Sequence, residues 1–218
     1  MNKTPYQFAL VGMSGKGKTM ALRNMNVETT GFVNMESKPL PFINNFKYYS
    51  TPDNYQEAYK KLIEYAKDES IKVVILDSFS AYVDSLLKTA RETKKGFDIW
   101  NFYNEEIGKL LFMIKKFPKH IIVTAHYEWV ETEVGAIEKR ITVKGKEWKG
   151  LIEKEFTLVH YADMKIIDDK RQYFIELHSD GKSSGKTPPM FVEENEERIE
   201  NDYAPFIERV EKILSNNK

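Results

Sequence analysis

The sequence predicts an α/β protein with a mainly parallel central sheet, flanking helices, and antiparallel strands toward the C-terminus. Short apolar runs of strand length alternate with helical patterns over residues 5–126, which favours parallel strands joined by crossovers. Several of these runs end at a polar side chain or a glycine-rich loop. Beyond residue 126 polar and apolar positions alternate instead, as is typical of antiparallel hairpins.

The first predicted strand, Gln7–Val11, is mostly apolar, as expected for a strand covered on both faces. It leads into Gly12–Thr19, which reads G-x-x-x-x-G-K-T, and a helix-compatible segment, Met20–Met25, follows. In such a P-loop the glycines let backbone N–H groups surround phosphate oxygens, and the helix N-terminus adds partial positive charge. We therefore expect a nucleotide to be bound by Gly12, Ser14, Gly15, Lys16, Gly17, Lys18, Thr19 and Met20.

Two side chains of this loop carry the expected phosphate chemistry. Lys18 would face solvent until a nucleotide arrives and would then reach the β- and γ-phosphates, while the Thr19 hydroxyl would bind Mg²⁺. A chance match to the motif should occur in on the order of one in a hundred chains of this length. The strand before it and the helical pattern after it make chance a weaker explanation.

A second strand, Gly31–Glu36, ends at a carboxylate. The segment 37–52 contains three prolines and cannot form one long helix. Asp53 is placed to cap the helix that follows, in which apolar residues recur at helical spacing.

Ile71–Ser78 is a β-branched apolar strand that ends at Asp77, the form of a Walker B segment. In P-loop enzymes this aspartate holds the Mg²⁺ shell, from a strand that we expect beside the P-loop strand. Many buried strands also end in an aspartate that serves only as a turn residue. The spacing of about 60 residues from the P-loop favours the Walker B interpretation.

Two helices, Ser80–Lys95 and Ile99–Lys116, precede a buried strand that ends at His126. The first helix becomes basic toward its end, and Pro118 stops the second. Because the carboxyl ends of parallel strands meet at one edge of a sheet, the P-loop, Glu36, Asp77 and His126 should lie together.

The C-terminal part should contain two antiparallel pairs, Tyr127–Val134 with Ile137–Val143 and Met164–Ile167 with Tyr173–His178. A Gly-, Ser- and Lys-rich loop follows the second pair, and an amphipathic helix at about 202–216 should pack on the core. We therefore expect residues 1–218 to form a single domain.

Composition excludes several classes of protein. The chain has 218 residues, of which 41% are hydrophobic and 30% charged, as is ordinary for a soluble globular protein. It has no cysteine, which excludes disulfides and thiolate metal sites and suits a reducing cytoplasm. No apolar run approaches the roughly 20 residues of a membrane helix, and the N-terminus has no signal-peptide pattern. Lys plus Arg and Asp plus Glu each total 33, so a nucleic acid would need a local basic patch.

Together these motifs make the chain resemble the RecA-like branch of P-loop ATPases. More narrowly, it resembles the short phage single-strand annealing proteins that consist of a minimal RecA core. The resemblance covers nearly the whole chain and rests on Gly12–Thr19, Val73–Ser78, Val33–Glu36 and His126. It implies that Glu36 is the catalytic glutamate and that His126 senses the γ-phosphate. The chain has only a few residues before its first strand, which by this resemblance favours annealing over strand exchange.

The resemblance also implies partners. It points to a DNA-dependent ATPase that uses ATP and Mg²⁺, binds single-stranded DNA, and forms a homo-oligomeric ring or filament in the host cytoplasm, with a single-strand-binding protein as a helper. The DNA-binding loops would fall near Arg91–Phe97 and within Tyr127–Lys149. The DNA-binding candidates are Lys139, Arg140, Lys144, Lys146, Trp148 and Lys149. These residues could equally form a solvated charged face.

The resemblance also implies a basic group that reaches the nucleotide of a neighbouring subunit. Its candidates are Lys182 and Lys186, which follow the last predicted strand in a flexible loop. The loop could instead be a plain surface loop. Likewise, Glu36 could be a solvated acid and His126 a core histidine. Two other functions stay open: a P-loop kinase of a small molecule, and a nucleotide-dependent assembly factor without enzymatic activity. The kinase is disfavoured because Arg91 is the only arginine between Phe79 and His126 that could serve a phosphate lid.

Overall fold

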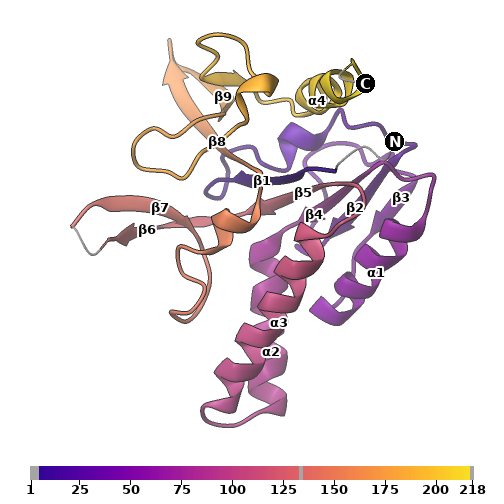
Figure 1. Ribbon diagram of the computed structural model, residues 1–218, viewed down its shortest axis with the longest axis vertical. Coiled ribbons are helices and arrows are strands. Elements are labelled where there is room, and N and C mark those ends of the chain that lie inside the picture. Colours follow the sequence, from indigo (N-terminus) through magenta and orange to yellow (C-terminus); the bar gives the residue numbers. More distant parts are fainter. Residues whose placement is uncertain (1–4, 133–134, 217–218) are drawn as a thin grey trace.

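The computed structural model describes residues 5–132 and 135–216, and in this part of the chain one sheet has eight strands (Figure 1). Its order is β10-β9-β8-β1-β5-β4-β2-β3. The parallel centre consists of β1 (Gln7–Val11), β5 (His120–Ala125), β4 (Val73–Asp77), β2 (Thr30–Asn34) and β3 (Tyr48–Ser50). The predicted α/β class with a mainly parallel sheet is confirmed.

The sheet changes direction at β8 (Leu158–Ile167). The first half of this strand runs parallel to β1, and from Tyr161 onward it pairs antiparallel with β9 (Lys170–Glu176). The short strand β10 (Arg198–Glu200) then pairs antiparallel with β9. The predicted antiparallel pair near the C-terminus is therefore confirmed, although β8 begins six residues earlier than Met164 because its buried first half completes the parallel sheet.

A separate two-stranded sheet, β6 (Tyr127–Glu131) and β7 (Ile137–Ile141), forms the predicted hairpin directly after β5. Residues 133–134, the end of its predicted first arm, lie outside the described residues. The hairpin leaves the main sheet on the side of β8 (Figure 1). It therefore starts directly after His126 and extends away from the parallel strands.

Helices cover both faces of the main sheet. The helices α1 (Tyr55–Lys67), α2 (Phe79–Thr93) and α3 (Asp98–Lys115) pack on one face, and α4 (Ala204–Asn216) packs on the other. Short 3-10 turns lie at η1 (Met20–Leu22), η2 (Ile152–Glu155) and η3 (Pro189–Phe191). None of the helices in the described ranges is long and apolar enough to span a membrane.

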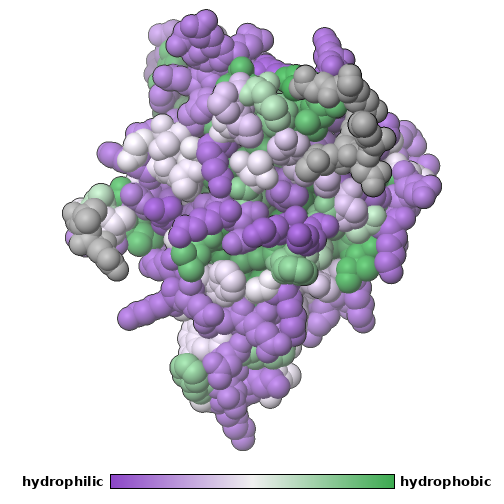
Figure 2. Space-filling view, viewed as in Figure 1, coloured by the Kyte–Doolittle hydropathy of each residue, from purple (hydrophilic) through white to green (hydrophobic). Residues whose placement is uncertain are grey.

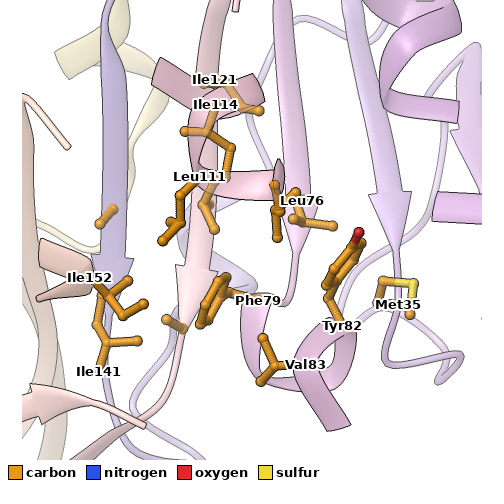
Figure 3. Close-up of a cluster of buried hydrophobic side chains, with 14 of the residues drawn as sticks. Met35, Leu76, Phe79, Tyr82, Val83, Leu111, Ile114, Ile121, Ile141 and Ile152 are labelled. Carbon is orange, nitrogen blue, oxygen red and sulfur yellow. The ribbon is translucent and has the colours of Figure 1, made fainter. Parts of the chain in front are cut away.

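Successive side chains of a strand point to opposite faces of the sheet, so the core is divided into two clusters, one on each face. In β1, Ala9 and Val11 join the cluster under α1, α2 and α3 (Figure 3), while Phe8 and Leu10 join the cluster under α4. All five residues of β1 and all five of β4 are buried, which explains their continuous apolar sequence. In α4, Phe206 and Val210 supply the apolar face that closes the second cluster.

Three local predictions are wrong. Met20–Met25 forms only the η1 turn, because the Asn26 side chain accepts hydrogen bonds from the backbone of Glu28 and Thr29 and starts a new turn. The N-cap of α1 is Asn54 and not Asp53, since the Asn54 side chain accepts from the Glu57 backbone at 3.0 Å. The Walker B strand β4 does not lie beside β1, because β5 lies between them. Because the η1 turn after the P-loop has only three residues, the helix-dipole contribution expected there is small.

Candidate active site

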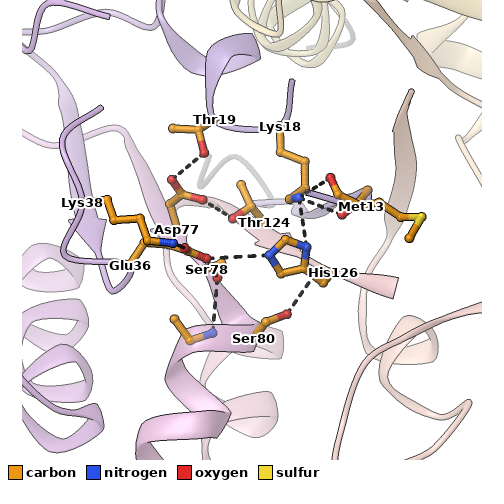
Figure 4. A network of polar contacts seen from close by, with 12 residues as sticks. Met13, Lys18, Thr19, Glu36, Lys38, Asp77, Ser78, Ser80, Thr124 and His126 are labelled. Atoms are coloured by element: carbon orange, nitrogen blue, oxygen red, sulfur yellow. Dashed lines mark hydrogen bonds and ion pairs between the residues drawn. The ribbon is translucent and has the colours of Figure 1, made fainter. Parts of the chain in front are cut away.

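The parallel strands end at a cavity of about 520 Å³, a volume that fits a nucleotide-sized ligand. The P-loop forms its floor, and side chains from the ends of β2, β4 and β5 reach into it (Figure 4). Its lining includes Ser14, Gly15, Gly17, Lys18, Thr19, Met20, Glu36, Lys38, Pro41, Asp77, His126, Tyr173 and Asn201. The structure thus brings together the four segments that the sequence placed at strand ends.

The backbone of the P-loop depends on its glycines. Gly15 and Gly17 have φ angles of +75° and +86°, in the left-handed region that other residues rarely adopt. A Cβ at Gly17 would lie 2.7 Å from the Asn201 side chain, and one at Gly12 would lie 2.7 Å from the carbonyl oxygen of Ala162. A side chain at either position would therefore displace its neighbours.

Lys18 is bound to its own loop. Its ammonium donates hydrogen bonds to the carbonyl oxygens of Gly12 at 2.7 Å and Met13 at 3.0 Å. Only 7% of the residue is exposed, so the prediction that it faces solvent is wrong. Burial lowers the pKa of Lys18 to about 8, although Asp77 and Glu36 act in the opposite direction. A phosphate would replace two neutral carbonyl partners with a charged one, which is the stronger acceptor.

Asp77 is buried between two hydroxyl groups. Its Oδ2 accepts a hydrogen bond from Thr19 Oγ1 at 2.9 Å, and its Oδ1 accepts one from Thr124. Desolvation raises the pKa of Asp77, against these two hydrogen bonds, which lower it. A nearby cation would stabilise the charged form.

Thr19 and Asp77 present hydroxyl and carboxylate oxygens side by side, the donor types that Mg²⁺ prefers. Within the described ranges no group of three His, Cys, Asp or Glu side chains could hold a metal ion by itself. The residues therefore fit a Mg²⁺ ion that shares its coordination with nucleotide oxygens and water.

Glu36 follows β2 and faces the cavity with a fixed carboxylate. Ser78 donates a hydrogen bond to its Oε1 at 2.8 Å, and the Lys38 ammonium lies 3.4 Å from its Oε2. The facing His126 ring, with further help from Ser78 and Lys38, lowers the pKa of Glu36 to about 2, against desolvation, which raises it. Glu36 is therefore ionised throughout the physiological range of pH.

His126 lies between Lys18 and Glu36. Its backbone N–H donates to Ser80 Oγ at 2.9 Å, its Nδ1 is 3.3 Å from the Lys18 ammonium, and its Nε2 is 3.8 Å from Glu36 Oε1. Because an ammonium can only donate, Nδ1 accepts and the proton of a neutral ring lies on Nε2, toward Glu36. The ring can therefore respond to whatever replaces Lys18 beside it.

Four polar residues around this site had no role predicted from the sequence: Ser78, Ser80, Thr124 and Lys38. Each of the three hydroxyl groups belongs to or directly follows β4 or β5, or begins α2. Hydroxyl residues at the carboxyl ends of buried strands are the signal that could have found Ser78 and Thr124. Ser78 also caps α2 by accepting from the Ala81 backbone, so one side chain fixes both the helix and Glu36.

Two further contacts hold the P-loop from the C-terminal part of the chain, and neither was foreseen. Lys16 pairs with Asp163 of β8 at 2.7 Å. Asn201 donates a hydrogen bond to the Gly17 carbonyl at 3.2 Å. The antiparallel part of the sheet thus supports the phosphate loop.

The predicted DNA-binding residues have different environments. Lys139 is 7% exposed, pairs with Asp180 at 2.7 Å, and lies against the rings of Tyr127, Trp129 and Tyr161. It is therefore not available to a DNA phosphate, and that prediction is corrected: Lys139 anchors the hairpin to the sheet.

Trp148 is half-buried: its indole donates to the Asn104 carbonyl at 3.1 Å and its ring packs against Gly108 of α3, so its contact with DNA stays a prediction. Arg140 is paired with Glu138, and Lys149 with Glu128 at 3.5 Å. Lys144 and Lys146 are exposed.

Lys144 lies in a surface cleft beside α2 and α3. The cleft is lined by Asp84, Leu87, Lys88, Arg91, Glu92, Trp100, Lys144 and Gly145. The end of these two helices projects from the body of the protein, and its surface in this view is largely hydrophilic (Figures 1 and 2). Two stretches that the sequence suggested separately, the end of α2 and the segment after β7, therefore meet here.

Lys182 and Lys186 do not line the cavity of their own chain. Lys182 is exposed, and its carbonyl accepts a hydrogen bond from the Lys139 backbone at 2.6 Å. Lys186 pairs through its backbone with Val159 of β8. Contact with a neighbouring subunit's nucleotide stays a prediction.

Comparison with protein families matches residues 4–188 to a family described as AAA domain. No curated protein matches the chain. Among solved structures, a KaiC-like protein from the hyperthermophilic archaeon Pyrococcus horikoshii OT3 is similar, with a TM-score of 0.47 and 15% identity. That similarity covers 78% of this chain and 77% of the other.

The lowered pKa of Glu36 predicts a specific loss of stability in acid. A carboxylate held ionised in the folded state stabilises the protein fully above its ordinary pKa of 4.5, and this contribution is lost as pH falls toward about 2. Between pH 5 and pH 3, the free energy of unfolding in urea should therefore fall less in Glu36→Gln than in the wild type. Glu28 is an exposed carboxylate whose ion pair with Lys47 spans 3.6 Å. The free energy of unfolding of Glu28→Gln should therefore fall as much as that of the wild type. An equal fall in the free energy of unfolding in Glu36→Gln and in the wild type would contradict the stabilisation of ionised Glu36 by its neighbours.

Proposed function

Because this chain belongs to the AAA domain family, we propose that its cavity binds ATP with Mg²⁺ and hydrolyses the terminal phosphate. One observation carries the proposal: the P-loop, Asp77, Glu36 and His126 come from separate segments and line a single cavity. A lysine, a magnesium-binding aspartate and a water-orienting acid are the groups that phosphoryl transfer to water requires.

Each side chain has a distinct task in this scheme. Mg²⁺, held by Thr19 and Asp77, would neutralise charge on the phosphates. Lys18 leaves the carbonyl groups of its own loop and binds the phosphate oxygens, so the departing charge is stabilised. His126, Ser78 and Lys38 keep Glu36 ionised, so its carboxylate can accept a hydrogen bond from the attacking water. It therefore orients the attacking water through Oε2, while Ser78 holds Oε1.

His126 connects the site to the rest of the molecule. When Lys18 moves to a phosphate, His126 Nδ1 loses its neighbour, and a ring that carries a proton on Nδ1 can donate a hydrogen bond to the γ-phosphate. Tyr127 follows directly and packs against Trp129 and Tyr161 at the base of the hairpin. A change at His126 is thereby passed to β6 and β7, which supports a nucleotide-dependent change in partner binding.

We further propose that the partner is single-stranded DNA and that the protein promotes annealing or recombination as a phage-encoded homo-oligomer, a ring or a filament, helped by a single-strand-binding protein. The cleft at α2 and α3 supports DNA binding, because Lys88, Arg91 and Lys144 gather there beside Trp100. Phe97, at the adjacent helix connection, is 75% exposed and free to stack on a base. In such an oligomer, Lys182 or Lys186 would reach a neighbouring subunit's phosphate.

ATP turnover tests the enzymatic proposal. Glu36→Gln keeps the shape of the side chain but removes the charge that orients water. We expect kcat to fall by about 10²-fold or more, while the dissociation constant for ATP changes only a few-fold. Glu28→Gln is the matched control and should hydrolyse ATP as the wild type does. Normal turnover by Glu36→Gln would move the water-orienting role to another residue. A wild type that transfers phosphate to a small molecule would identify a kinase instead.

The salt dependence of DNA binding tests the proposed cleft. The triple variant Lys88→Gln/Arg91→Gln/Lys144→Gln should bind single-stranded DNA more weakly, with a flatter dependence of log affinity on log salt. Each lost phosphate contact lowers this slope by roughly 0.7. The control Lys60→Gln/Lys67→Gln/Lys72→Gln removes the same charge from exposed positions on and next to α1, away from the cleft, and should keep the wild-type slope. Equal slopes in all three proteins would reject the cleft as the DNA site.

A further inference from the structure

We propose that Lys38 is a second phosphate-binding cation of the site, supplied by the same chain and directed at the terminal phosphate of the nucleotide. The inference rests on the proposed nucleotide site. It adds a residue that the P-loop motif does not contain and that lies outside the Walker B strand. Three observations carry it: the construction of the turn that holds Lys38, the position of its ammonium, and its freedom to move.

The turn after β2 is fixed from inside the protein by Asn34, which is 1% exposed. Its Oδ1 accepts a hydrogen bond from the Glu36 backbone at 3.1 Å, and its Nδ2 donates to the Lys38 carbonyl at 2.8 Å. Ser37, between these two residues, adopts the left-handed conformation with φ +53°. A buried amide thus closes a tight turn that presents Glu36 and Lys38 next to each other.

The Lys38 side chain belongs to the wall of the cavity, on the side of Glu36 and opposite Lys18 and His126 (Figure 4). Its ammonium lies 3.4 Å from Glu36 Oε2. A phosphate bound by Lys18 would therefore have the second ammonium on its other side. Two cations on opposite sides of a transferring phosphoryl group stabilise charge on oxygens that one cation cannot reach.

Lys38 is also free to exchange partners. Its side chain is 78% exposed, and an ion pair at this exposure is weak. A terminal phosphate carries more charge than one carboxylate and offers three acceptor oxygens, so the ammonium should move to it. This movement has a second effect, because it frees Glu36 Oε2, the oxygen that Ser78 does not hold. Binding of the triphosphate would thereby release Glu36 to orient water.

The proposal predicts a loss that depends on the γ-phosphate. In calorimetric titrations with Mg²⁺, Lys38→Met should bind a non-hydrolysable ATP analogue about 10-fold more weakly, while its affinity for ADP stays within two-fold of the wild type. The kcat for ATP should also fall, and Lys38→Arg should recover most of the analogue affinity because it restores the charge. A merely structural role for Lys38 would lower both affinities together.

Lys47→Met is the matched control, since Lys47 lies in the same segment, pairs with Glu28 across 3.6 Å and does not line the cavity. It should bind both nucleotides like the wild type. Unchanged selectivity between the analogue and ADP in Lys38→Met would overturn the role of Lys38 alone. A wild type that binds neither nucleotide would overturn the nucleotide site, and the role of Lys38 with it.

Discussion

The buried carboxylate of Asp77 joins the three central segments of the site. It accepts hydrogen bonds from Thr19 of the P-loop and Thr124 of β5, and it is itself the last residue of β4. At 3% exposure the carboxylate would be strongly destabilised without these donors. The order of the strands supplies Thr124, because β5 lies between β1 and β4 and places this residue beside Asp77. The position of the residues proposed to bind Mg²⁺ therefore depends on this strand order.

Much of the fold and the principal site residues could be predicted from the sequence. Strands buried on both faces are continuous apolar runs, so β1, β4 and β5 stood out, and the residue at the end of each run had to lie at the carboxyl edge of the sheet. The glycines of the P-loop are required by its backbone, since Gly15 and Gly17 have positive φ angles. Patterns imposed by local geometry can be read from one sequence.

The remainder depends on tertiary contacts and on the paths of loops and turns, which no motif specifies. Lys139 resembled an exposed basic residue, yet Asp180, 41 positions away, and three aromatic rings bury it. Lys18 was expected in solvent because its carbonyl partners, Gly12 and Met13, belong to a loop whose path the motif does not specify. The position of Lys38 could not be predicted because the turn that brings it to Glu36 is closed by the side chain of Asn34. No residue type or spacing in the sequence predicts such contacts.

Phosphate release from MgATP, measured with and without single-stranded DNA in the wild type and in Asp77→Asn, tests whether the carboxylate of Asp77 is needed for ATP hydrolysis. The amide keeps the size of the side chain and can still hydrogen-bond, but it lacks the charge that a Mg²⁺ ion needs. We expect the wild type to release phosphate, and to release it faster with DNA, while Asp77→Asn releases almost none in either condition. Phosphate release by Asp77→Asn at the rate of the wild type would contradict the proposed role of Asp77. A wild type that binds MgATP and never hydrolyses it would contradict the proposed ATPase activity.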